Sequence, residues 1–146
     1  MKYPLFIIIL SITLFSCSKD HGDDAAKQNA LTTGTWKLTG CMTDYEKDGV
    51  YEENTYSMLA GCYKDNIYTF HADGSETTDE GPTKCNSNNP QTYTSTWSFT
   101  DHQTRLQFGS GNYEIKELNA TTLTLKNRTS YNIIYTIDVK TTYTKQ

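Results

Sequence analysis

The histidines and acidic residues are the first candidates for metal binding. His21, His71 and His102 are far apart, and none lies at ligand spacing from another histidine or from a cysteine pair. Zinc sites require such spacing, so the sequence predicts no zinc site. Residues 44–49 begin like a calcium-binding loop, but the twelfth position is Thr55 instead of a bidentate glutamate. We therefore interpret this segment as a polar turn and expect no metal.

Catalytic motifs are also lacking in the sequence. It contains no Gly-x-Ser-x-Gly elbow, no glycine-rich phosphate loop and no dinucleotide fingerprint. Asp79 and Glu80 are adjacent carboxylates, but neighbouring residues of a strand point to opposite faces. We therefore expect both on the surface and not as a cooperating acid–base pair. The sequence favours a protein that is not an enzyme and uses no cofactor.

Cys17 ends a segment that is typical of an export signal. Lys2 supplies a positive start, and the apolar run 5–15 is shorter than the about 20 residues that span a bilayer as a helix. Residues 14–17 (LFSC) resemble the bacterial lipobox, whose cysteine is acylated and becomes the new N-terminus, although Phe15 is bulkier than usual there. We predict a signal peptide over 1–16 and lipidation of Cys17. The alternative is an ordinary secreted protein with an incidental Cys17.

Residues 17–30 are predicted to form a flexible polar tether. Two or more acyl chains, such as palmitate, give stable attachment, whereas one chain is marginal. The Lys/Asp-rich stretch 18–24 resembles signals that send lipoproteins of Bacteroidetes-type bacteria to the cell surface; the alternative is a plain linker. We expect a lipid-anchored protein of the outer membrane, on the periplasmic side or at the surface.

The remaining three cysteines are candidates for a disulfide, because the compartment beyond the inner membrane is oxidising. Three pairings exist in principle. We favour Cys62–Cys85, since the two residues flank a predicted hairpin around Asp73-Gly74 at equal distance. Cys41 is then left over. Its parity is opposite to that of Trp36, which predicts a position outside the barrel interior. We expect a quiet, partly buried thiol; the alternative is a reactive or metal-binding cysteine.

The body of the chain, 31–146, reads as one domain of short alternating strands. Threonine is abundant and there are 11 tyrosines, both of which favour strands. One helical turn is expected within 57–63. The net charge is −4 and no Lys/Arg cluster is present, which argues against nucleic acid as a partner. The predicted strands are 35–43, 66–71, 75–80, 92–100, 105–108, 113–118, 121–127 and 131–143.

Eight successive strands with one apolar face each can bury that face in a closed barrel or in a sandwich. Closure also removes unpaired edges. In these features the chain resembles the lipocalin-like lipoproteins of Bacteroidetes-type bacteria. The resemblance rests on the segments LTTGTW (31–36), CYKDNIYTF (62–70), DGS (73–75), Cys85, TWSF (96–99), YEIKEL (113–118) and TLTL (122–125). It implies an all-β, eight-stranded, antiparallel up-and-down barrel with Trp36 at the closed end, and the same Cys62–Cys85 pair.

The predicted barrel interior is the one candidate functional surface. Eight strands enclose either a filled core or room for one small ligand. The first hypothesis is a membrane-anchored carrier of a small, partly apolar ligand. The second is a non-catalytic structural or interaction lipoprotein with a filled barrel, in which 44–63 and 81–90 contact partners of unknown identity. The candidate lining residues are Trp36, Leu38, Phe70, Trp97, Phe99, Tyr113, Ile115, Leu125, Ile133 and Tyr135, and the inward set also includes Leu106, Leu123 and Ile137.

Overall fold

The computed structural model describes residues 20–131, 133 and 135–146. The predicted signal peptide and Cys17 lie outside these residues. The helices are α1 (Asp20–Thr32), the 3₁₀ helix η1 (Thr55–Met58) and α2 (Gly61–Lys64). The strands are β1 (Trp36–Asp44), β2 (Glu53–Asn54), β3 (Ile67–Phe70), β4 (Ser75–Asp79), β5 (Thr92–Thr100), β6 (Arg105–Phe108), β7 (Gly111–Leu118), β8 (Thr122–Ser130) and β9 (Thr136–Lys145).

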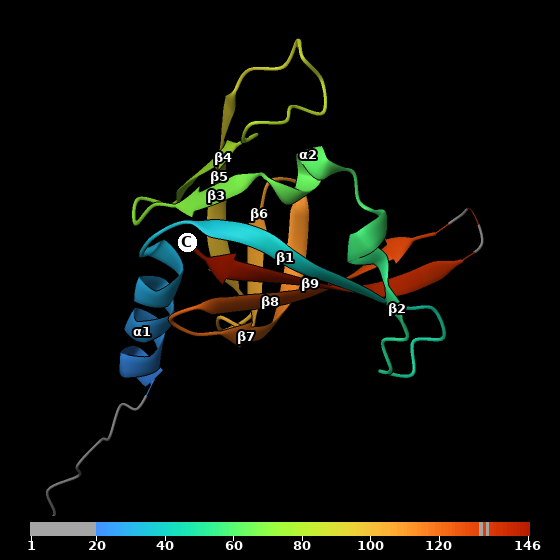
Figure 1. Cartoon of the computed structure of the whole chain (residues 1–146). Helices are drawn as coiled ribbons and strands as arrows, with labels where there is room; N and C mark the ends of the chain where they lie inside the picture. Colours follow the sequence, from blue (N-terminus) through green and yellow to red (C-terminus); the bar gives the residue numbers. More distant parts are fainter. Residues whose placement is uncertain (1–19, 132, 134) are drawn as a thin grey trace, which may run out of the picture.

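The strands form one antiparallel ring (Figure 1). From β3 to β9 each strand pairs with the next along the chain, and β9 returns to pair with β1 from Trp36↔Lys145 to Asp44↔Asp138. This last pairing closes the sheet, which confirms the predicted barrel over the sandwich. The extra strand is β2, a two-residue element that pairs with Met42 and Thr43.

The hairpin turns follow from local side-chain chemistry. At the β3–β4 turn, Gly74 has a φ of 85°, and the Asp73 carboxylate accepts bonds from the Ser75 amide (2.9 Å) and hydroxyl (2.6 Å). Aspartate and glycine favour such turns for these reasons. At the β7–β8 turn, the side-chain oxygen of Asn119 accepts the amides of Thr121 and Thr122, both at 2.9 Å. These turns set the register that the sequence predicted.

The gap between β1 and β3 is covered by the short helices. β3 pairs with β1 only at Trp36 and Lys37, and β2 pairs only at Met42 and Thr43, so residues 38–41 of β1 lack a strand on that side. The Tyr56 hydroxyl donates to the Leu38 carbonyl (3.3 Å), and the Thr55 hydroxyl donates to the Cys41 carbonyl (3.3 Å). The predicted helical turn within 57–63 is thus two turns, η1 and α2, and they help to seal the barrel wall.

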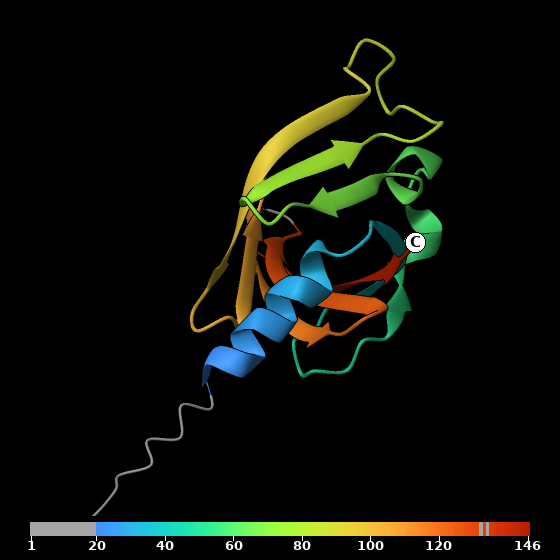
Figure 2. The same ribbon diagram turned by 90° about the vertical axis from the view of Figure 1, so that its left-hand side faces the viewer.

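The predicted flexible tether is wrong for residues 20–30, which belong to α1 (Figure 2). This segment contains alanine, lysine and glutamine, which favour helices, and it leads to Leu31, which is fully buried. The Lys27 ammonium donates to the Gln103 carbonyl (3.3 Å), and the Lys145 ammonium donates to the Ala30 carbonyl (2.8 Å). Tertiary packing therefore orders a sequence whose polarity predicted disorder.

The predicted strand 131–143 is also corrected. β8 continues to Ser130, which pairs with Thr136 at the start of β9. Tyr131, Ile133 and Tyr135 lie at the tip of the hairpin between them, and the Tyr131 amide donates to the Tyr135 carbonyl (2.8 Å). Alternation alone could not distinguish a strand from this tip, because the tip keeps the same spacing of apolar residues.

Candidate ligand-binding site

One end of the barrel interior is packed beneath α1. Trp36, at the start of β1, has no exposed surface, and its indole Nε1 donates to the Leu31 carbonyl at 2.8 Å. Leu106, Leu123 and Leu125 are equally buried around it. The Lys145 ammonium lies 4.8 Å from the centre of the Trp36 ring, within the range of a cation–π contact. This arrangement matches the closed end expected for Trp36.

Aromatic rings fill the next part of the interior. Phe70 meets Trp97 at a centroid distance of 5.9 Å and Phe108 at 5.4 Å, both edge to face. Trp97 also meets Phe99 edge to face at 5.4 Å, and its indole donates to the His71 carbonyl at 2.8 Å. Such contacts are favourable beyond simple area burial.

Tyrosines line the interior beyond this aromatic layer. Tyr68, Tyr113 and Tyr143 pack against the core but remain only partly buried, so water reaches them. Burial raises the pKa of all three phenols. For Tyr143, the nearby Tyr68 and Tyr113 raise the pKa further. The side chains beneath α1 are therefore fully buried, whereas the tyrosines farther in keep some accessible surface.

An acidic wall completes the interior, and the sequence did not reveal it. Glu76 and Thr78 on β4 pair with Phe70 and Tyr68 of β3, so their side chains share the inward face. Glu76 is 2% exposed and Glu80 is 8% exposed. The predicted surface position of Glu80 is therefore wrong. The alternation of β4 does separate Asp79 from Glu80, as predicted, but it turns Glu80 inward.

Most of the predicted lining residues have inward positions. The eight that lie on the inner face are Trp36, Leu38, Phe70, Trp97, Phe99, Tyr113, Ile115 and Leu125. Ile133 and Tyr135 do not line the barrel: Ile133 is fully exposed and Tyr135 is exposed at the hairpin tip. The Tyr135 hydroxyl donates to the Tyr45 carbonyl at 3.0 Å. Of the other predicted inward residues, Leu106, Leu123 and Ile137 are buried.

The disulfide joins Cys62 and Cys85, as predicted, with a Cα–Cα distance of 5.1 Å. It ties α2 to the loop after β4. Gly81 lies against Asp65 so closely that a Cβ at Gly81 would be 2.5 Å from the Asp65 carbonyl oxygen. The Asp65 carboxylate accepts the Thr83 amide at 2.9 Å. The covalent link and these contacts hold α2 beside the end of β4 that carries Glu80.

Cys41 is buried, and the prediction that it lies outside the interior is wrong. A β-bulge between Leu38 and Gly40 shifts the alternation of β1 by one residue. Leu38 pairs with Tyr143 and Cys41 pairs with Thr141, so both face the same side. The thiol lies 3.3 Å from the Thr55 hydroxyl.

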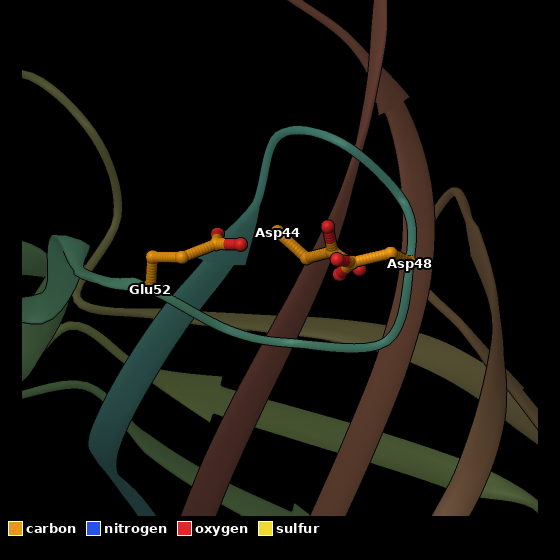
Figure 3. A group of neighbouring side chains, drawn as sticks. All are labelled: Asp44, Asp48 and Glu52. Carbon is orange, nitrogen blue, oxygen red and sulfur yellow. The ribbon is translucent and has the colours of Figure 1, made fainter.

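An acidic cluster lies at the far end of β1, outside the predicted lining (Figure 3). Carboxylate oxygens of Asp44, Asp48 and Glu52 lie within 4.8 Å of one another, and only Asp44 is buried. The Asp44 carboxylate accepts the amides of Lys47 (2.5 Å) and Gly49 (2.9 Å). These hydrogen bonds satisfy the buried Asp44 carboxylate. Asp44 therefore stabilises a polar turn.

Several hollows lie on the outer surface of the barrel and beside α1, and two of them are representative. One of about 260 Å³ is lined by charged residues of the outer face of β6 to β9, among them Arg105, Lys126 and Asp138. Another of about 330 Å³ lies between α1 and the β7–β8 turn, against Ala26 and Leu118. Both are open to the surface and neither contains the predicted lining.

A small antiparallel barrel with a packed end and an aromatic, partly polar interior defines a lipocalin-like architecture. A family model described as a lipocalin-like domain matches residues 32–125. The chain belongs to this family of lipocalin-like domains. A comparison with curated proteins found no match. Within the described residues, no helix has both the length and the apolar character needed to cross a membrane.

Proposed function

We propose that this protein is a lipid-anchored, outer-membrane lipocalin-like protein that binds a small, partly apolar ligand inside its barrel. The observation that carries the proposal is the contrast between the two parts of the interior. Trp36 and its neighbours are fully buried, whereas the inward-facing Tyr68, Tyr113 and Tyr143 keep accessible surface. Aromatic walls with a few polar groups are typical of small-molecule sites.

Membership of the lipocalin-like family supports ligand binding, and the interpretation of residues 1–17 supports the anchor. The proposed function is non-catalytic. The interior contains aromatic residues, hydroxyls and carboxylates, and the described hydrogen bonds within it include no nucleophile–base pair.

Native mass spectrometry of the protein purified from its own host tests this proposal. We expect a bound small molecule that leaves on denaturation. Narrowing the accessible part by Ile115→Trp should displace it, because Ile115 lies on the inner face and is only partly buried. Lys116→Trp, on the exposed neighbour, is the matched control. Ligand retained equally by both variants would contradict binding in the barrel.

A second candidate function is protein interaction through the hairpin tip. Tyr45, Tyr131 and Tyr135 stack there, with centroid distances of 5.6 and 6.5 Å, next to the exposed Ile133. Tyrosine is enriched among the residues that contribute most to binding at protein interfaces. Cross-linking in cells from position 133 should then capture a partner, whereas cross-linking from the exposed Ser110 should not.

A further inference from the structure

Two buried carboxylates, one on β4 and one directly after it, face the barrel interior. Glu76 pairs with Phe70 on one side and with Ser95 on the other. Glu80 follows four residues later, just after β4, and its Oε1 accepts the Tyr93 hydroxyl at 2.8 Å. Both carboxylates therefore lie on the wall formed by β3, β4 and β5, facing the aromatic layer described above.

One of the four oxygens of these two carboxylates lacks a hydrogen-bond donor among the described residues. The two oxygens of Glu76 accept hydroxyls of Thr78 and Ser95, each at 2.6 Å. In Glu80 only Oε1 has a donor; Oε2 is buried and has no hydrogen-bond partner among the described residues. A carboxylate oxygen that is removed from water without a donor costs free energy.

No cation of the described chain compensates these carboxylates. The ion pairs within it involve Asp101, Glu114 and Asp138, all remote from the inward face of β4. Buried carboxylates are ordinarily paired with a cation. Among the described residues, the side-chain carboxylates of Glu76 and Glu80 accept hydrogen bonds from neutral hydroxyls only. The site is thus negatively charged, aromatic and short of one donor.

We infer that the ligand of this barrel carries a cationic amine, which donates to Oε2 of Glu80 while its apolar part lies against the tyrosines of the interior. This inference rests on the proposed function and specifies the ligand class. Glu76 adds negative charge on the same face, and tyrosine rings favour a nearby cation. A ligand with a carboxylate at this point would be repelled.

A pair of fluorescent probes with one ring system tests the charge requirement. Dansylcadaverine carries an ammonium and dansylglycine carries a carboxylate on the same naphthalene group. With the full chain carrying Cys17→Ser, which avoids acylation, we expect dansylcadaverine to bind at least about tenfold more tightly. Glu80→Gln should lower the affinity for dansylcadaverine about tenfold. The glutamine side chain still offers an oxygen that accepts the Tyr93 hydroxyl. Asp79→Asn removes the same charge from the opposite face of the strand and should leave binding unchanged.

The outcomes separate this inference from the proposed function. Equal binding of both probes, with no effect of Glu80→Gln, would contradict the amine inference and leave ligand binding in the barrel intact. If neither probe binds and Ile115→Trp displaces no native ligand, both proposals fail. Because the comparison of probes on the parent chain needs no substitution at Glu80, it holds even if Glu80→Gln lowers stability, which thermal unfolding measures.

Discussion

Asp138 shows how a single buried charge depends on its partners. It lies on the outer face of β9, is 2% exposed, and accepts the Arg128 Nε at 2.7 Å and the Lys126 ammonium at 2.8 Å. The hydrogen bond from Arg128, aided by that from Lys126, lowers the pKa of Asp138 to about 2, although burial opposes this. The ionised form of the Asp138 carboxylate is therefore more stable in the folded state than in the unfolded chain.

This pKa predicts a loss of stability in acid. Since the folded pKa lies below the unfolded value of 3.8, the stabilisation is present above about pH 4 and is lost as the pH falls towards 2. Its size is of the order of 2 kcal/mol. Asp138→Asn should lower the free energy of unfolding by that amount at pH 7, and the difference from the parent protein should shrink at pH 2. Urea unfolding measures both; Glu46→Gln, an exposed acid, is the control. A difference that does not change with pH would contradict this assignment.

The disulfide acts at the scale of elements, since it ties α2 to the loop after β4. Cys62 and Cys85 are 23 residues apart, and closing such a loop stabilises by about 3 kcal/mol on the chain-entropy estimate. The double variant Cys62→Ser/Cys85→Ser should lose about this much free energy of unfolding. A reductant should destabilise the parent protein similarly and leave the double variant unchanged. Cys41→Ser, which keeps the disulfide, should remain sensitive to the reductant; insensitivity would indicate a different pairing.

Leu31 attaches helix α1 to the core of the barrel. This side chain has no exposed surface and lies next to Trp36 in the core. Leu31→Ala should lower the free energy of unfolding by about 3 kcal/mol, as is typical of buried leucine. It should also speed amide exchange over 23–31. Ala25→Ser, on an exposed position of the same helix, should do neither. Slow exchange of α1 in Leu31→Ala would show that other contacts order the helix.

At the scale of the whole molecule, attachment to the membrane is expected to depend on one residue. Stable attachment requires the acyl chains predicted on Cys17. Cys17→Ser should move the protein from the membrane fraction to the soluble fraction, as cell fractionation and immunoblotting would measure. Cys41→Ser, a buried cysteine elsewhere, should leave the protein in the membrane fraction. Retention of Cys17→Ser in membranes would contradict the anchor.

The two ends of the barrel have different surroundings. α1, which leads from the N-terminal residues, lies at the packed end, and the β8–β9 hairpin projects on the other side of the molecule (Figure 1). If Cys17 is anchored as proposed, we expect the packed end to face the membrane. The hairpin tip with Tyr131 and Ile133 then points away from it, towards any partner.

Local patterns in the sequence were sufficient to predict most of the strands, the hairpin turns and the disulfide. Alternation along 92–100, the Asp-Gly turn at 73–74 and the spacing of Cys62 and Cys85 are local properties, and local chemistry governs them. Eight of the ten predicted lining residues face inward for the same reason. These patterns, with the family resemblance, were sufficient for the barrel.

Where the alternation breaks or the neighbours are distant in sequence, the burial of a side chain depends on the tertiary fold. The bulge in β1 turns Cys41 inward, and the extension of β8 to Ser130 leaves Ile133 in water. Packing of Leu31 on the core orders α1. Glu80 becomes an interior carboxylate because β3, β5 and α2, which are remote in sequence, assemble around it. Burial is a sum over contacts between distant segments, so no local pattern could contain it.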